Sequence, residues 1–430
     1  MRSASAVLIV LCVACTTGAS PPPPAKTLHI AVDLPLTGPE GRAGTTVLNG
    51  VRFFVQTHPT LAGFTVELTA ADDAGGGPAN PSRGLTNLQG FLENANVMAM
   101  IGPLDGAVAR AEIPSANAAG LAMVTPATSN PCLTRDVYMP TLLNPSRTPI
   151  TCAQAHLPSA TELRPAHTNN FFRLATTDEL QGAAAADYLY DQLHVLRAAV
   201  ISDSELYGQG LAGAFAARFA RRGGTVVGRA EVDPGHPDAG DFLNRMKQQG
   251  ARAVYFGGAS EPGCAVRSQM SSVFPTGSAT PFLGPDGIAH DPACLKAAGD
   301  NSAGIFATVP IADAASRTGA AATIRDFKAR FTRTADFGPY TMPAYDATAI
   351  LYAALERAIT AAGGRLPART AVIAELARTS GFAGTTGTLG FDAAGDTTNR
   401  VISIFQAPGP DPGAAWPLAA TIDYSARLPY

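Results

Sequence analysis

The sequence contains one motif with an explicit chemical interpretation, the glycine pattern Gly208-Gln209-Gly210-Leu211-Ala212-Gly213. This GxGxxG spacing is typical of a dinucleotide-binding turn, in which an acidic residue follows about 20 residues later, and Glu231 stands near that place. The glycines of such a turn follow their strand directly, whereas Ser204 to Tyr207 separate them from the preceding apolar run. An NAD-type dinucleotide-binding enzyme is therefore the remote alternative. We expect these glycines to allow a helix to pack closely on a sheet.

Other catalytic and metal-binding signatures are missing from the sequence. It has no GxSxG, HExxH or Walker A motif, and its seven histidines form no pair with metal-ligand spacing. The net charge is −3 and no run of basic residues occurs, so nothing indicates a nucleic-acid partner. We expect a protein that is not an enzyme and that needs neither a cofactor nor a metal.

The N-terminal segment predicts export. Arg2 precedes a short apolar run, which is typical of a signal peptide over residues 1–14. Cys12-Val13-Ala14-Cys15 resembles a bacterial lipobox, although Cys12 stands where leucine is usual, and Cys15 would then carry the lipid. Ordinary secretion with cleavage elsewhere is the alternative. Residues 15–25 contain four consecutive prolines, a stiff spacer that suits a tether to the membrane surface.

Four cysteines remain in the exported part of the chain. An even number in an oxidising compartment predicts disulfides. Proximity along the chain favours Cys132–Cys152 and Cys264–Cys294, each worth roughly 3 kcal/mol in the chain-entropy model. The other two pairings and free buried thiols remain open.

Two series of alternating strands and helices must position any site. In the first, strands are predicted at 28–32, 64–69, 97–101 and 121–124, with helices between them, including one over 106–118. The rhythm breaks over 131–169, a Pro-, Thr- and Asn-rich surface excursion that we expect the Cys132–Cys152 pair to fold down. Thr176 and Glu179 have capping-box spacing and predict the start of the next helix.

The second series continues to the end of the chain. Its strands are predicted at 198–202, 225–232, 253–256, 281–283 and 305–309, and Val401 to Phe405 is taken as the final strand. Such βαβ alternation predicts parallel sheets with helices on both faces. Ligands bind beyond the carboxyl ends of such strands, so two facing lobes predict a cleft.

The order of short motifs along the chain resembles the leucine/isoleucine/valine-binding family of type I periplasmic binding proteins. The resemblance covers nearly all of the exported chain and is carried by these segments: Val32 to Pro39, Ala71 to Asp73, Met123 to Thr128, Tyr207 to Gly210, Tyr255 to Gly258, Phe282 to Gly287, Tyr345 to Ala347 and Gly387 to Asp392. It implies an α/β fold with two doubly wound parallel-sheet lobes joined by a three-segment hinge. Lobe 1 would hold residues 26–175 and 309–400, and lobe 2 would hold 176–308 and 401–430.

The resemblance also implies a function. Members of this family are substrate-binding proteins of ABC importers, so the chain would capture an amino acid or a related small polar molecule for permease and ATPase subunits. It would be a monomer at the periplasmic or extracellular face of the bacterial cytoplasmic membrane. The alternative within the same fold is a ligand-sensing receptor that signals to a membrane partner.

In lobe 1, the resemblance places donors for a ligand carboxylate in two loops. One contains Asp105, Gly106 and Ala107, and the other contains Ala127, Thr128 and Ser129. Thr128 and Ser129 could instead only shape their loop. Asp105 stands where the family has serine, and it has two interpretations. It either caps the helix from 106 or points into the cleft, where it would repel a carboxylate and favour amides, amines or polyols.

In lobe 2, the resemblance indicates three further cleft residues. Tyr207 matches an aromatic cleft residue, and Asp286 matches the acid that receives the ligand ammonium, although it is one carbon shorter than the usual glutamate. A loop tyrosine and a turn aspartate are the alternatives. Ala259 replaces another aromatic, which widens the expected cleft and argues against a branched aliphatic ligand.

Overall fold

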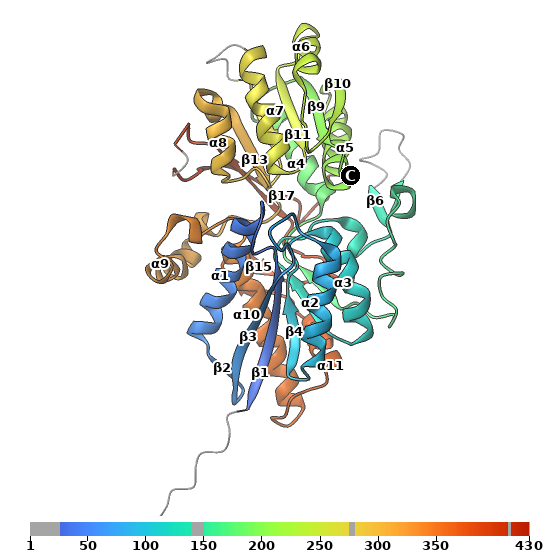
Figure 1. The fold of residues 1–430 in the computed structure, drawn as a ribbon, viewed down its shortest axis with the longest axis vertical. Helices are drawn as coiled ribbons and strands as arrows, with labels where there is room; N and C mark the ends of the chain where they lie inside the picture. The colour runs from blue at the N-terminus through green and yellow to red at the C-terminus, as the bar shows by residue number, and fades with distance from the viewer. Residues whose placement is uncertain (1–25, 140–149, 275–279, 412–413, 430) are drawn as a thin grey trace, which may run out of the picture.

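The molecule consists of two α/β lobes stacked along its long axis (Figure 1). The structure is a computed structural model that describes residues 26–139, 150–274, 280–411 and 414–429. The predicted signal peptide, Cys15 and the Pro-rich tether lie outside the described residues. Among the described ranges, none of the helices combines the length and apolar composition that crossing a bilayer requires.

Lobe 1 is built on a six-stranded sheet with the order β2-β3-β1-β4-β5-β8. All neighbouring pairs are parallel except β2 with β3. Strand β4 is buried along its whole length, as expected for a parallel strand covered on both faces. The strands are β1 Thr27–Leu34, β2 Thr60–Leu61, β3 Phe64–Asp72, β4 Val97–Ile101, β5 Ala122–Thr125 and β8 Phe171–Arg173.

Helices cover both faces of the lobe 1 sheet. Helices α1, α10 and α11 pack together on one face, and α2 and α3 pack on the other. Their bounds are α1 Gly41–Thr57, α2 Pro81–Glu93, α3 Gly106–Ala118, α9 Ala321–Arg330, α10 Thr341–Ala361 and α11 Arg369–Ala377. A small hairpin of β14 (Phe382–Gly384) and β15 (Gly387–Leu389) completes this lobe.

Lobe 2 is built on a seven-stranded sheet with the order β10-β9-β11-β12-β13-β16-β17. The strands are β9 Arg197–Asp203, β10 Thr225–Val232, β11 Ala253–Gly257, β12 Phe282–Gly284, β13 Ile305–Val309, β16 Val401–Gln406 and β17 Leu418–Asp423. The first five run parallel, and β16 and β17 are antiparallel. The expectation that 401–405 is the final strand is wrong. Strand β17 follows β16 and forms the sheet edge, and its residues, Leu-Ala-Ala-Thr-Ile-Asp, contain no continuous apolar run of the kind that predicted the other strands.

The helices of lobe 2 also lie on both faces of their sheet. Helices α4 and α5 pack against each other on one face, and α6, α7 and α8 form the other layer. Their bounds are α4 Asp178–Asp191, α5 Leu206–Arg221, α6 Gly240–Gln248, α7 Ser260–Val273 and α8 Pro292–Ala298. The predicted capping box at α4 is wrong. Thr177 is the N-cap and makes no side-chain capping bond, because its hydroxyl donates to Glu179 instead.

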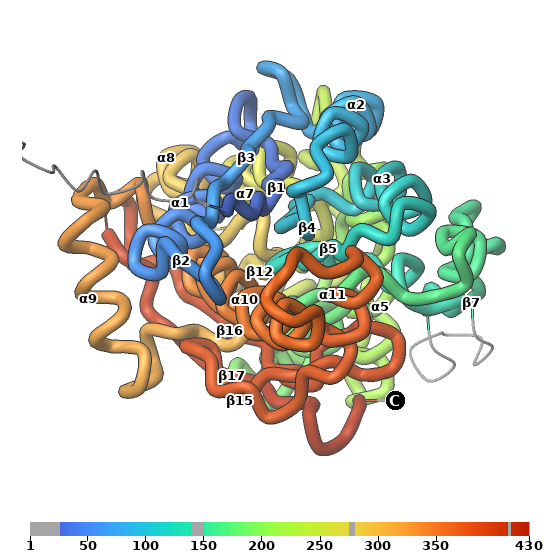
Figure 2. Tube along the Cα trace, turned by 90° about the horizontal axis from the view of Figure 1, so that it is seen from below, coloured from blue at the N-terminus to red at the C-terminus, as the bar shows by residue number. Residues whose placement is uncertain are grey.

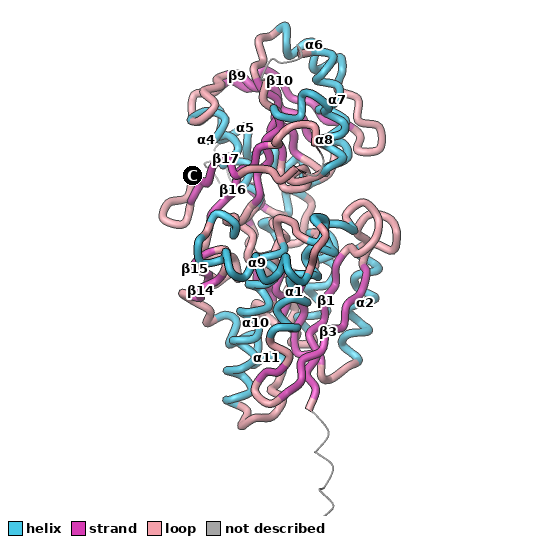
Figure 3. The backbone as a smooth tube through the Cα atoms, turned by 90° about the vertical axis from the view of Figure 1, so that its left-hand side faces the viewer, coloured by secondary structure: helices cyan, strands magenta, loops and turns pink. Residues whose placement is uncertain are grey.

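The chain passes between the two sheets three times, after β8, after β13 and before β16 (Figure 3). These passages lie side by side. The Thr176 N–H donates to the Pro310 carbonyl at 2.7 Å, and the Arg173 N–H donates to the Gly395 carbonyl at 3.0 Å. Arg173 is fully buried there and pairs with Asp396 at 2.7 Å. The passages are therefore tied to one another by backbone and ionic contacts.

The excursion between β5 and β8 projects from the side of the molecule (Figure 2). The disulfide Cys132–Cys152 closes it, and β6 (Val137–Met139) pairs with β7 (Ile150–Thr151). It is not purely a surface loop, because Met139 is buried among residues of α4 and α5 in lobe 2. The second predicted disulfide, Cys264–Cys294, joins α7 to α8.

Candidate ligand-binding cleft

Asp286 is the centre of a hydrogen-bond network between the lobes. It lies in the loop after β12 and accepts from the Tyr207 hydroxyl at 2.7 Å and from Gln181 Nε2 at 2.9 Å, both in lobe 2. Its other oxygen accepts from the Tyr340 hydroxyl at 2.7 Å, and Tyr340 belongs to lobe 1. Three of the roughly four acceptor positions of this carboxyl group are thus engaged. The residue expected to receive a ligand ammonium therefore already holds protein donors.

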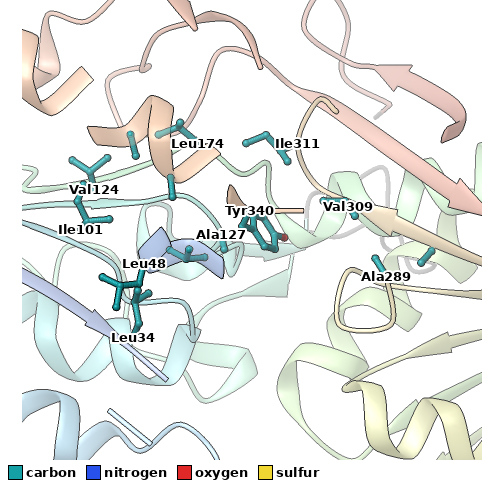
Figure 4. Close-up of a cluster of buried hydrophobic side chains, with 14 of the residues drawn as sticks. Leu34, Leu48, Ile101, Val124, Ala127, Leu174, Ala289, Val309, Ile311 and Tyr340 are labelled. Atoms are coloured by element: carbon teal, nitrogen blue, oxygen red, sulfur yellow. The ribbon is translucent and has the colours of Figure 1, made fainter. Parts of the chain in front are cut away.

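Tyr340 and Gln181 were not predicted from the sequence. Tyr340 precedes α10 and is 7% exposed, and its ring lies near Ala127 with the hydroxyl toward Val309 of lobe 2 (Figure 4). Burial and the nearby Asp286 carboxyl raise the pKa values of Tyr207 and Tyr340 well above 10.0, so both hydroxyls remain donors at neutral pH. An aromatic before a helix is also the ordinary signature of a core residue, so the sequence did not distinguish the two roles.

Asp105 caps α3. Its Oδ1 accepts from the Ala107 N–H at 2.7 Å and from the Val108 N–H at 2.9 Å. The Ala107 donor that the sequence offered to a ligand carboxylate is therefore engaged by the protein itself. Gly106 opens the helix and lies against Thr128, so the two predicted lobe 1 loops do meet.

The second lobe 1 loop is held together by its own hydrogen bonds. The Thr125 hydroxyl accepts from the Ala127 N–H at 3.3 Å and from the Thr128 N–H at 3.2 Å. The Thr128 hydroxyl donates to the Pro103 carbonyl at 2.8 Å and is 2% exposed. The predicted donors Ala127 and Thr128 thus shape the loop.

Ser129 connects this loop to lobe 2 through a residue that the sequence did not single out. Its carbonyl accepts from the Asp178 N–H at 3.1 Å, and its hydroxyl lies close enough to the Asp178 carboxyl group to influence its pKa. Asp178 is 3% exposed, and burial, with repulsion from Glu179 and Asp286, raises its pKa to about 7. Its Oδ1 accepts no hydrogen bond from any residue that the structure describes. An acidic residue in the first turn of a helix is ordinarily explained by its favourable interaction with the helix dipole. The sequence therefore gave no reason to assign Asp178 an interlobe contact.

Glu40 adds a further acidic group at the N-terminus of α1. Burial and repulsion from Asp105 and Asp286 raise its pKa to about 7. Near it, Arg42 is exposed and donates to the lobe 2 carbonyl of His290 at 2.8 Å. Carboxyl groups of both lobes thus lie close together here, namely Glu40 and Asp105 of lobe 1 and Asp286 of lobe 2.

Ala259 lies beside the Asp286 loop and is exposed. Its N–H donates to Asp203 Oδ2 at 2.8 Å, and its Cα would lie 3.8 Å from a Cβ added at Gly287. Because the Ala259 side chain is only a methyl group, no aromatic ring stands at this position beside the Asp286 loop. The structure thus brings Tyr207, Asp286 and Ala259 together in lobe 2, and Tyr340 of lobe 1 joins them through its bond to Asp286.

The glycine motif of α5 serves packing in two directions. A Cβ at Gly208 would collide with the Asp203 carboxyl and the Gly257 carbonyl, which is the close approach of helix to sheet that we predicted. Gly210 and Gly213 face the excursion instead. A Cβ at Gly210 would collide with the Tyr138 hydroxyl, and one at Gly213 would lie 2.8 Å from Met139 Cε. At Gly210 and Gly213 the protein itself occupies the space that an added Cβ would enter, so close packing accounts for both glycines.

One set of metal-ligating atoms lies close together in the described ranges, namely Cys264, Asp291 and Cys294. The two sulfur atoms are joined in a disulfide, and Asp291 accepts from Ser260 and from the Ala293 N–H. A disulfide offers no thiolate to a metal, so this cluster is a covalent brace between α7 and α8.

Comparison with known proteins agrees with this architecture. The model of the periplasmic binding protein family matches residues 27–411. Leu/Ile/Val-binding protein homolog 3 of Brucella melitensis is 27% identical over 382 residues, covering 88% of this chain and 91% of that protein.

Solved structures show the same fold. A leucine-binding protein from Thermotoga maritima superimposes with a TM-score of 0.72 at 24% identity, covering 92% of this chain and 98% of that chain. An ABC transporter solute-binding protein from Rhodopseudomonas palustris, in complex with p-hydroxybenzoic acid, gives 0.72 at 17% identity and covers 94% and 99%. The fold is thus used for both amino-acid and aromatic-acid ligands.

Proposed function

The chain belongs to the periplasmic binding protein family, and from this membership we propose that it is the extracytoplasmic substrate-binding protein of an ABC importer that captures an amino acid or a related small polar molecule between its lobes. The observation that carries the proposal is the network at Asp286, where Tyr207 and Gln181 of lobe 2 meet Tyr340 of lobe 1. Polar groups of both lobes converge at one point, so a ligand there would contact both lobes and favour the closed state.

The relatives support binding rather than catalysis. The Brucella melitensis relative is named as a Leu/Ile/Val-binding protein, and the two solved structures are a leucine-binding protein and a solute-binding protein. We propose that the ligand-bound closed form docks on permease and ATPase subunits. The N-terminal sequence further supports export with residues 1–14 as signal peptide and Cys15 as lipid acceptor.

Thermal melting of the purified protein against a solute panel tests this function. The panel contains amino acids, amides, amines, polyols and aromatic acids. A ligand at 100 times its Kd should stabilise the folded form by about 2.7 kcal/mol, a clear rise in Tm. Asp286→Ala and Tyr207→Ala should abolish most of that rise without unfolding the protein, whereas Asp241→Ala, on the exposed face of α6, should preserve it. Absence of any shift in the wild-type protein, or equal shifts in all variants, would contradict the proposed site.

A further inference from the structure

The place where a ligand carboxylate would bind in lobe 1 is filled by a carboxyl group of the protein. The free N–H groups at a helix N-terminus are the donors that anions use. At α3, Asp105 Oδ1 takes two of these donors, from Ala107 at 2.7 Å and from Val108 at 2.9 Å. A ligand carboxylate at this helix would therefore compete with a tethered one and would be repelled by its charge.

The neighbouring donors are consumed as well. The N–H groups of Ala127 and Thr128 donate to Thr125, and the Thr128 hydroxyl donates to Pro103. The Ser129 hydroxyl lies beside the Asp178 carboxyl group and acts to lower its pKa. The two lobe 1 loops, 105–107 and 127–129, thus offer few free hydrogen-bond donors to an anionic ligand.

The lobe 2 side of the network, at α4, instead contains buried hydrogen-bond acceptors that no donor in the described part of the chain reaches. Asp178 Oδ1 and Gln181 Oε1 accept no hydrogen bond from the described residues, and they lie three residues apart on one face of α4. Both residues are 3% exposed or less. Gln181 contacts Asp286 directly, which places this face of α4 at the interlobe network. Buried acceptors without donors are destabilising, so a ligand that donates hydrogen bonds would be favoured there.

Around Asp178, the two carboxyl groups of Glu179 and Asp286 oppose one cation, Arg173. Besides burial, the charges of Asp105 and Asp286 raise the pKa of Glu40, and those of Glu179 and Asp286 raise the pKa of Asp178. Arg173, the cation that acts on Asp178, is already bound by Asp396 at 2.7 Å and by the Asn130 carbonyl at 2.7 Å. This cation is thus already paired, and a cationic ligand would supply a further counter-charge to Asp178.

We propose that the ligand is a small cation, such as a primary amine or an amino-acid amide, that carries no free carboxylate and whose ammonium donates to Asp178. This inference rests on the proposed function and narrows its ligand class. Asp178 becomes the specificity-determining acceptor, and Asp105 is the residue that rejects zwitterionic amino acids.

Matched ligands that differ only at the carboxylate test the proposal. Titration calorimetry would compare leucine with leucinamide and 3-methylbutylamine, and phenylalanine with phenylalaninamide and 2-phenylethylamine. In at least one series, the amide or amine should bind tenfold or more tightly than the amino acid. Equal or tighter binding of the amino acid would overturn the inference and leave the proposed function intact. Binding only of solutes without a cationic nitrogen would likewise overturn the inference and leave the proposed function intact. If no solute in the panel binds, both the inference and the proposed function are contradicted.

Two variants assign the roles. Asp105→Gly releases the Ala107 and Val108 donors at little cost to the helix, because glycine is a tolerated N-cap. It should raise the affinity for the amino acid relative to its amide at least tenfold. Asp178→Asn should weaken binding of the amide or amine at least tenfold, and Asp241→Asn on α6 is the matched control that should not. Unchanged relative affinities in Asp105→Gly, or equal effects of Asp178→Asn and Asp241→Asn, would overturn the assignment.

Discussion

At the scale of single residues, the molecule carries an unusual number of buried carboxyl groups. Asp33, Asp73 and Glu112 of lobe 1 are all fully buried, and burial raises the pKa of each. For Asp73, burial and repulsion from Asp33 and Asp105 raise the pKa from 3.8 to about 8. Neither side-chain oxygen of Asp73 accepts a hydrogen bond from the described part of the chain. Such a group is neutral in the folded state at pH 7.

This raised pKa predicts that stability falls as pH rises. The folded protein holds the Asp73 proton more tightly than the unfolded chain does, so the stabilisation is complete below about pH 4 and is lost between about pH 4 and pH 8. Asp73→Asn removes the titration. We expect this variant to be more stable than wild type by about 6 kcal/mol at pH 9 and by only about 2 kcal/mol at pH 5, measured by urea unfolding. The same difference at both pH values would contradict the assignment of the proton.

At the scale of elements, the excursion after β5 is a structural bridge to lobe 2. Its disulfide Cys132–Cys152 holds β6 in place, and the Tyr138 hydroxyl donates to the Leu206 carbonyl at the start of α5 at 2.8 Å. The glycines at 210 and 213 give β6 room against α5. The GxGxxG spacing therefore arises from helix packing on two sides, and this explains a motif that suggests nucleotide binding when read alone.

Gly210→Ala tests this packing. The added methyl group would displace the Tyr138 ring and break its bond to Leu206, so we expect a loss of about 1 kcal/mol in the free energy of unfolding. The double variant Gly210→Ala with Tyr138→Ala should lose less than the sum of the two single changes. Gly90→Ala in α2, where nothing lies within 4 Å of the added Cβ, is the control and should be neutral or stabilising. Additive effects in the double variant would show that the two residues do not interact.

At the scale of the whole molecule, three chain passages and a few polar contacts control how the lobes meet. Tyr340–Asp286, Arg42 with the His290 carbonyl, and Tyr138 with the Leu206 carbonyl all join lobe 1 to lobe 2. Polar contacts between domains are individually weak, so hinge motion between open and closed states is expected. The Tyr340 bond lies at the proposed ligand site and would couple ligand binding there to closure of the lobes.

Tyr340→Phe should shift the molecule toward the open state. The variant loses the interlobe bond to Asp286 but keeps the ring that packs in the core. We expect a larger radius of gyration for the ligand-free protein by small-angle X-ray scattering, and weaker ligand binding. Tyr352→Phe is the control, because the Tyr352 hydroxyl donates to the His58 carbonyl within lobe 1 at 3.1 Å. Equal radii for Tyr340→Phe, Tyr352→Phe and wild type would show that this bond does not hold the lobes together.

The sequence by itself determined most of the elements. Helix α3 and strands β4, β10 and β13 lie at the predicted residues, because short apolar runs and helical periodicity are local properties of the chain. The disulfides Cys132–Cys152 and Cys264–Cys294 are the pairs predicted from proximity along the chain, which is also a local property. The edge strand β17 and the short strands of the excursion were missed, since their patterns are weak without a partner strand.

Only the tertiary structure decided the composition of the cleft. Asp105 has two local interpretations, and its hydrogen bonds to Ala107 and Val108 settle which one applies. Asp178, Gln181 and Tyr340 acquire their roles from residues more than 45 positions away along the chain, as in the Asp178 N–H bond to Ser129 and the two bonds to Asp286. A side chain's environment depends on which lobe faces it. That pairing is fixed by chain passages and packing over long distances, and no local period encodes it.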